Sequence, residues 1–164
     1  MTHEAALQLR IAQAGDVPAL LAMMVDFNAH EQIAWSPADG EAPLRLLLAA
    51  PELGRVGLLE RDGATLGYFV MTYGFDLEWG GRDAFLTELY LRPEARGRGL
   101  AGPALAAIEA LARAHEVRAL HLLVRPDNTA ARRAYARAGF AEPPAAVALT
   151  KPLGPARGGA GFGS

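Results

Sequence analysis

The sequence contains no cysteine among its 164 residues, and Lys151 is its only lysine. The absence of cysteine excludes disulfide bridges, thiolate zinc sites, iron–sulfur clusters and a cysteine nucleophile. No apolar run reaches the length of about 18 residues that spans a bilayer. The first residues also lack the basic and apolar stretches of a signal peptide. We therefore expect a cytoplasmic protein without a membrane partner.

The sequence also lacks a large excess of charge of either sign, since its formal net charge is −2 and its isoelectric point is near 6.1. A surface so balanced does not attract nucleic acid through its field. Hydrophobic residues make up 51% of the chain, which is enough for a sizeable core. The sequence predicts a single domain over residues 1–153 and a disordered, glycine-rich C-terminal tail over residues 154–164.

The apolar periodicity predicts alternating strands and helices. Asp62-Gly63 and Gly80-Gly81 are typical of turns between adjacent strands. The order of elements predicts an α/β (α+β) fold with a mixed, mostly antiparallel sheet flanked by helices. We expect strands over residues 7–11, 56–60, 66–76, 84–91, 117–124 and 145–151, and helices from Asp16 through Phe27 and over residues 43–50, 100–116 and 128–138.

A glycine-rich turn lies between the strand at 84–91 and the helix at 100–116. Gly97 and Gly99 would let a ligand approach the backbone closely, and the helix N-terminus favours a phosphate or pyrophosphate. Arg96 and Arg98 could add charge-assisted hydrogen bonds. The alternative is that the glycines only make a tight connection. The spacing matches neither a Walker loop nor a dinucleotide-binding fingerprint.

A second cluster lies on the helix at 128–138. Asn128 and Tyr135 are seven residues apart and share one helix face, with the small Ala131 between them. This arrangement leaves room for a ligand along the face. The alternative is that Asn128 caps the helix and Tyr135 is an ordinary half-buried aromatic residue.

The two clusters together resemble the GNAT superfamily of acetyl-CoA-dependent N-acetyltransferases. Arg96-Gly97-Arg98-Gly99-Leu100-Ala101 satisfies the family's Gln/Arg-x-x-Gly-x-Gly/Ala signature. The later pattern of asparagine, tyrosine and Gly-Phe is matched by Asn128, Tyr135 and Gly139-Phe140. The resemblance covers roughly residues 7–151, is most specific over 88–140, and implies the GNAT fold.

The resemblance also implies acetyl-CoA as the cosubstrate and assigns roles to matching positions. The backbone of the strand would bind the pantetheine arm, the glycine-rich turn the pyrophosphate and Asn128 the end of the pantetheine, while Tyr135 would protonate the departing thiolate. The strand residues are Leu89, Tyr90 and Leu91, and the turn residues are Arg96, Gly97, Arg98, Gly99, Leu100, Ala101 and Gly102. We expect the N–H of Leu89 or Leu91 to polarise the thioester carbonyl.

Glu88 is the candidate general base, because an amine must lose a proton before it attacks a carbonyl. Diamine-acetylating relatives carry two adjacent acids here, whereas Thr87 stands in place of the first one in this chain. The alternative for Glu88 is an ion pair or a solvated strand face. Direct attack in a ternary complex is the mechanism we expect, without a metal.

The acceptor amine is expected against the segment at 27–36, in which His30, Glu31 and Trp35 mix an acid with aromatic side chains. Asp76, Glu78 and Trp79 could form an opposite wall. Each of these residues also has a structural interpretation, with Trp35 stapling the helix junction. His115 and His121 are expected to be structural.

The sequence thus predicts transfer of an acetyl group to a primary amine on a small molecule. The motifs are nearest to those of GNAT members that acetylate diamines, polyamines and amino acids. The alternatives are a protein N-terminal or lysine acetyltransferase and a non-catalytic acyl-CoA-binding regulatory module. The oligomeric state stays open between a monomer and a homodimer.

Overall fold

The computed structural model describes residues 6–143 and 147–154. Five strands form one sheet in the order β1-β2-β3-β4-β5, with β1 to β4 antiparallel and β5 parallel to β4. The predicted mixed, mostly antiparallel sheet of an α/β fold is confirmed. The strands are β1 (Gln8–Ile11), β2 (Gly54–Arg61), β3 (Ala64–Asp76), β4 (Gly81–Leu91) and β5 (Ala119–Leu122).

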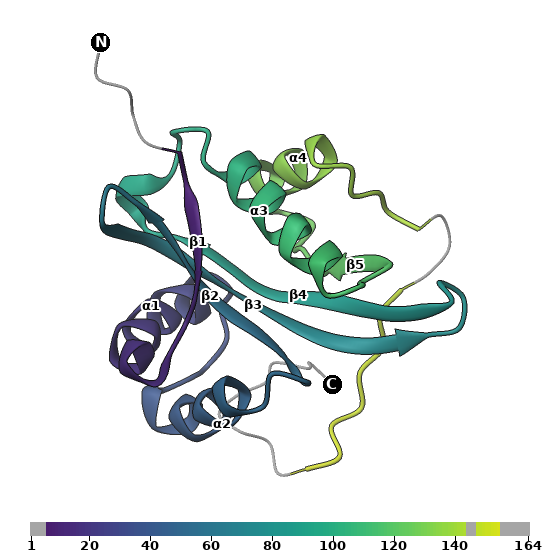
Figure 1. The fold of residues 1–164 in the computed structure, drawn as a ribbon, viewed down its shortest axis with the longest axis horizontal. Helices are drawn as coiled ribbons and strands as arrows, with labels where there is room; N and C mark the ends of the chain where they lie inside the picture. Colours follow the sequence, from purple (N-terminus) through teal and green to yellow (C-terminus); the bar gives the residue numbers. More distant parts are fainter. Residues whose placement is uncertain (1–5, 144–146, 155–164) are drawn as a thin grey trace.

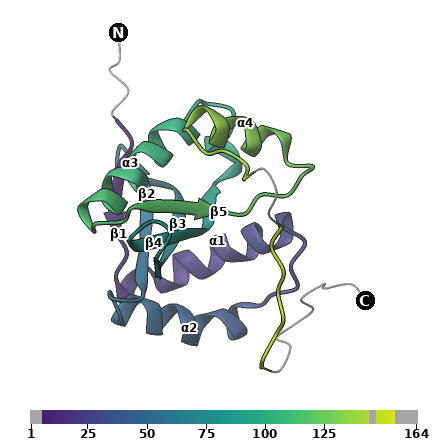
Figure 2. The same cartoon turned by 90° about the vertical axis from the view of Figure 1, so that its right-hand side faces the viewer.

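Helices cover both faces of the sheet (Figure 1). One face packs against α1 (Val17–His30) and α2 (Pro37–Ala49), and the other against α3 (Ala101–Ala114) and α4 (Thr129–Arg137). Each interface has its own apolar core, the first around Leu20, Leu58 and Tyr68 and the second around Phe69, Leu86 and Ile108. Seen along the sheet, β5 and α4 lie at one edge, above α1 (Figure 2).

The turn between β2 and β3 has the geometry expected from its residues. Asp62 has φ 51° and Gly63 has φ 76°, as a type I′ hairpin turn requires. This turn sets the register that pairs Arg61 with Ala64, so the predicted Asp-Gly hairpin is confirmed.

The second helix begins earlier than the expected residue 43. The Oγ of Ser36 accepts a hydrogen bond from the Asp39 N–H at 3.4 Å, and Pro37 occupies the first helical position. A serine cap followed by proline is a strong start signal. Pro43 is accommodated inside α2 rather than starting it.

Two strand predictions near the C-terminus are wrong in extent. β5 is limited to Ala119–Leu122, shorter than the expected 117–124, because its pairing with β4 ends at Leu86–Leu122. The expected final strand at 145–151 does not form over residues 147–151, which are not paired in the sheet, and Val147 and Leu149 there are exposed. Residues 145 and 146 lie outside the described part of the chain.

Candidate functional site

A bulge in β4 opens the sheet between β4 and β5. Val70 pairs with Glu88 and Met71 pairs with Leu86, so Thr87 is the extra residue. The pairing of β4 with β5 runs from Asp83 to Leu86 and stops immediately before the bulge. A bulge bends its strand away from the regular ladder. The segment from Glu88 to the end of β4 therefore borders an opening on its β5 side.

Backbone groups of β4 line this opening. The N–H of Arg92 donates to the Leu66 carbonyl at 2.8 Å, toward β3. Because backbone groups alternate between the two edges of a strand, those of Leu89 and Leu91 point away from β3 and toward the opening. The backbone of Tyr90 instead faces β3, and its hydroxyl donates to Asp26 Oδ2 at 3.1 Å. Two of the three expected strand residues thus present backbone groups where an extended ligand could pair.

The glycine-rich turn lies directly ahead of α3. Gly97 and Gly99 both have φ of 70°, in the left-handed region that favours glycine. A Cβ added at Gly97, Gly99 or Gly102 would meet no atom within 4 Å, so the surface there is open. Leu100 is buried and Ala101 begins α3, whose first N–H groups have no partner within the helix. These features fit a phosphate-bearing group.

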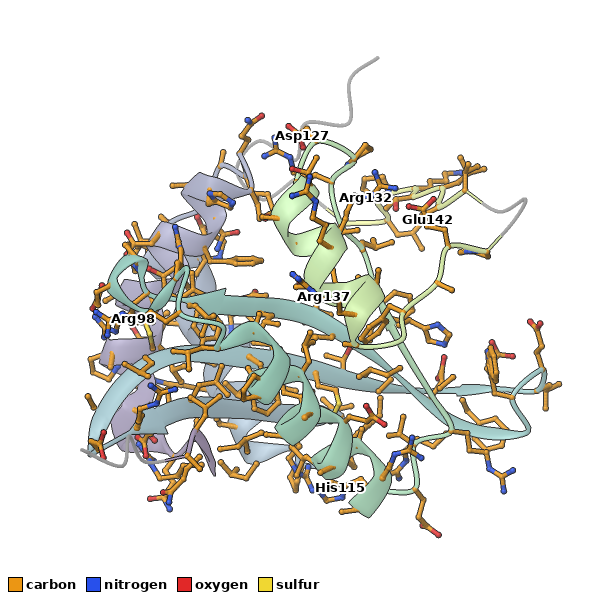
Figure 3. All side chains as sticks on the ribbon, turned by 90° about the horizontal axis from the view of Figure 1, so that it is seen from above. Arg98, His115, Asp127, Arg132, Arg137 and Glu142 are labelled. Atoms are coloured by element: carbon orange, nitrogen blue, oxygen red, sulfur yellow. The ribbon has the colours of Figure 1, made fainter. Side chains whose placement is uncertain are left out.

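The two arginines of the turn are placed differently. The Nε of Arg96 donates to the Leu91 carbonyl at 2.8 Å, and its guanidinium lies 5.4 Å from the centre of the Tyr90 ring. Arg98 is exposed on the loop ahead of α3, while His115 lies at the far end of that helix (Figure 3). Arg96 therefore holds the end of β4 through its Nε, while Arg98 stands on the exposed loop.

Glu88 lies on the α1 side of β4, at the bulge. The hydroxyl of the buried Tyr68 donates to Glu88 Oε2 at 2.5 Å, across the β3–β4 pair. Burial raises the pKa of Glu88 above its ordinary value, and the hydrogen bond from Tyr68 lowers that pKa in part. A carboxylate with a raised pKa, at the edge of an opening, is suited to accept a proton.

Tyr135 is positioned by the way α4 ends. The N–H of Phe140 donates to the Tyr135 carbonyl at 3.0 Å and that of Gly139 to Ala136 at 3.1 Å, with φ of 94° at Gly139. This is a Schellman motif, and the Tyr135 and Phe140 rings make its apolar contact with centroids 5.8 Å apart. The pKa of Tyr135 is raised mainly by burial and to a smaller extent by the nearby charge of Glu31. Its hydroxyl is therefore protonated at neutral pH and able to donate.

Asn128 caps α4. Its Oδ1 accepts a hydrogen bond from the Ala131 N–H at 3.2 Å. The capping interpretation is thereby confirmed for this atom. The cap uses only the carbonyl oxygen, so the side-chain NH₂ can still donate to a ligand.

The end of α1 lies close to the loop that precedes α4. Arg125 Nη1 donates to the His30 carbonyl at 3.1 Å, and Arg125 forms an ion pair with Asp127 at 2.5 Å. Glu31 follows directly at the end of α1, within electrostatic reach of Tyr135. The structure thus brings the end of α1 next to the loop before α4, and the role of His30 and Glu31 in an acceptor site stays a prediction.

Trp35 is placed as a packing residue. Its indole covers Gly40, where an added Cβ would come within 1.9 Å of the ring. It also packs against the core between α1, α2 and the sheet. This placement matches the staple interpretation of Trp35.

The expected opposite wall lies at the turn between β3 and β4. Asp76 and Glu78 are in or beside the β3–β4 turn, where Asp76 Oδ1 accepts from the Glu78 N–H at 2.8 Å. The Trp79 ring lies 6.3 Å from the His121 ring of β5. Tyr68 and Asp26 were not identified from the sequence, because their contacts depend on how β3 and α1 sit on β4.

Within residues 6–143 and 147–154, no group of three or more histidine, aspartate or glutamate side chains is placed to hold a metal ion. No helix in the same part of the chain is long and apolar enough to cross a membrane.

Comparison with known proteins places the chain among acetyltransferases. Residues 21–140 match the model of the acetyltransferase (GNAT) family. No curated protein matches the chain. Among solved structures, an integron cassette protein from the mobile metagenome of Cole Harbour Salt Marsh is 34% identical, with a TM-score of 0.78 over 91% of this chain and 92% of that protein.

Two further structures share the fold. A putative acetyltransferase from Arthrobacter sp. FB24 is 29% identical, with a TM-score of 0.71 over 88% of this chain and 92% of that one. An aminoglycoside N-acetyltransferase, AAC(6')-Iy, in complex with CoA is 16% identical, with a TM-score of 0.74 over 92% of this chain and 98% of that one.

Proposed function

Because this chain belongs to the GNAT family of acetyltransferases and is therefore an acyltransferase, we propose that it moves an acetyl group from acetyl-CoA to a primary amine on a small molecule. The observation that carries the proposal is the opening beside β4, with Glu88 at its edge and the glycine-rich turn at its end. Acetyl-CoA would supply the activated acetyl group as a thioester.

The chain's own residues would hold this cosubstrate. The backbone of Leu89 and Leu91 offers strand-like pairing in the opening. The turn from Gly97 to Gly102 and the N-terminus of α3 offer N–H groups to a pyrophosphate, with Arg98 beside them. The side-chain amide of Asn128 offers a donor on the far side of the opening. A structure of AAC(6')-Iy with CoA supports this use of the fold.

Two side chains would handle protons. Glu88 accepts the proton that the ammonium form of the amine must lose before its nitrogen can attack. Tyr135 donates a proton to the leaving sulfur as the new carbon–nitrogen bond replaces the carbon–sulfur bond. Cysteine is absent from the chain, so direct attack within a ternary complex is the simplest route. Holding the amine and thioester together supplies much of the rate.

The test is release of the CoA thiol from acetyl-CoA in the presence of polyamines, amino acids, aminoglycosides, arylalkylamines and short peptides, each in turn. The proposal predicts release with at least one class of small primary amine, together with the acetylated product by mass. Release with peptides alone would contradict a small-molecule acceptor and favour a protein acceptor.

A further inference from the structure

The face of the sheet that carries Glu88 continues into a group of exposed rings. Ala84 and Leu86 lie in the core under α3, so Phe85 between them points to the opposite face. Because the bulge at Thr87 adds one residue, Glu88 points to the same face of the sheet as Phe85. Glu88 accepts a hydrogen bond from Tyr68 on this face, which is the α1 side. Phe85 and Glu88 are three residues apart, at most about 10 Å along the strand.

The rings form one surface across β4, β5 and the turn before β4. Phe85 pairs with His121 in the ladder, and their ring centroids are 5.2 Å apart. The Trp79 ring lies 6.3 Å from the same imidazole. Asp83 Oδ2 lies 3.4 Å from His121 Nε2 and helps to fix that ring. We call Trp79, Phe85 and His121 the aromatic platform.

The aromatic platform is open. Phe85 is 41% exposed and Trp79 is 48% exposed. The β3–β4 hairpin extends beyond α1 and α2, so neither helix covers this end of the face (Figure 1). Exposed apolar rings that adjoin a reaction site favour a ligand that removes them from water.

We propose that the aromatic platform binds the body of the acceptor, and that the acceptor is a primary amine with an aromatic ring on a linker of a few carbon atoms. The inference rests on the proposed function. With the nitrogen at Glu88, a short linker would place a ring on the platform, where offset or edge-to-face contacts with Phe85 and His121 are favourable.

The carboxylates of this face argue against a polyamine. A second ammonium group would need a second free acid along the platform. Asp83 is the acid beside Phe85 and His121, but its side chain is only 15% exposed and it faces His121. Asp76 and Glu78 lie beyond Trp79 in the β3–β4 turn, at the end of β4 remote from Glu88. Glu88 therefore offers one cationic site, and the rest of the platform offers rings.

Three amines of similar reach test the inference: 2-phenylethylamine, hexylamine and 1,4-diaminobutane. Ring contacts are worth about 0.5–1.5 kcal/mol beyond their area, which corresponds to a preference of roughly two- to tenfold. We expect kcat/KM to be higher for 2-phenylethylamine by this factor or more. Phe85→Leu and, separately, Trp79→Leu should reduce the preference, mainly through KM.

Phe75→Leu is the matched control. Phe75 is 72% exposed on the same hairpin, but it shares its face of β3 with Tyr73 and Met71 on the α3 side. Phe75→Leu should keep the wild-type preference for 2-phenylethylamine over the other two amines. Two results would overturn the aromatic platform and leave acetyl transfer standing. One is a kcat/KM for hexylamine or 1,4-diaminobutane equal to that for 2-phenylethylamine. The other is an unchanged preference in Phe85→Leu and Trp79→Leu, as expected for Phe75→Leu. Absence of transfer to every small amine would overturn both proposals.

Discussion

At the scale of single residues, two opposed effects set the acidity of Glu88. Burial raises its pKa, and the hydrogen bond from Tyr68 lowers it. A general base acts only when ionised, so activity should rise with pH through the pKa of Glu88. The position of that rise reports how strongly Tyr68 holds the carboxylate.

Removal of the Tyr68 hydroxyl should move this rise to higher pH. Tyr68→Phe takes away the one hydrogen bond that lowers the pKa of Glu88, while the ring stays packed against Phe27 and Tyr90. The measurement is kcat/KM against pH for the variant and the wild type. Tyr73→Phe is the control, because the Tyr73 hydroxyl is buried without a hydrogen-bond partner among the described residues. Coincident profiles for Tyr68→Phe and the wild type would contradict this role.

Tyr135→Phe should lower turnover and spare cosubstrate binding. General acid catalysis typically contributes about a hundredfold or more. The ring would keep its contact with Phe140, so α4 should still end in the same way. We expect kcat to fall by roughly this factor, with the Kd for acetyl-CoA changed less than about threefold. Unchanged turnover would remove Tyr135 as the acid.

The sequence could propose Glu88 and Tyr135 because the resemblance to the GNAT family assigns roles at their positions, and both roles stay predictions. It could not identify Tyr68, because the hydrogen bond joins residues 20 positions apart in the sequence. That contact requires the register of β3 on β4, which the bulge at Thr87 shifts by one residue.

At the scale of elements, the turn before α3 is the feature most dependent on residue type. Gly97 and Gly99 need positive φ, and the space above them is open. The sequence predicted this turn because two glycines directly ahead of a periodic helix fit a ligand-binding turn as well as a tight connection. The extent of the opening beside β4 could not be predicted from the sequence, since it depends on where the β4–β5 pairing stops.

Gly99→Val should weaken acetyl-CoA binding more than tenfold. A β-branched side chain would occupy the open surface of the turn and resist its φ of 70°. The measurement is the Kd for acetyl-CoA by calorimetry.

Gly63→Val is the matched control for Gly99→Val. Gly63 has φ of 76° and open space around it, but it lies in the β2–β3 hairpin turn. Both variants should lose folding stability to backbone strain, and only Gly99→Val should lose affinity. Equal affinities in the two variants would refute the assignment of the turn.

Element boundaries were the weakest part of the sequence predictions. The start of α2 was missed although Ser36-Pro37 is a good signal, because Pro43 also resembles a helix start. The expected last strand had a suitable composition over residues 147–151. A strand also needs a neighbour to pair with, and composition does not reveal whether one is there.

At the scale of the whole molecule, the two faces of the sheet carry the residues of the two proposed proton-transfer roles. Glu88, Phe85 and the end of α1 lie on the side where we place the acceptor, while Tyr135 and the core under α3 lie on the other. The opening between β4 and β5 joins these sides. The order of elements was enough to predict the fold class, but only the assembled sheet shows which residues share a face.

The most direct test of the account is the rate at which wild type and Glu88→Gln form N-acetylated product from acetyl-CoA and a small primary amine at pH 8. Glutamine keeps an oxygen for the Tyr68 hydroxyl but cannot take a proton from the amine. We predict product with the wild type, a rate lower by about a hundredfold in the variant, and similar affinity for acetyl-CoA in both. Equal rates in the two proteins, or no acetylated amine with either, would contradict it.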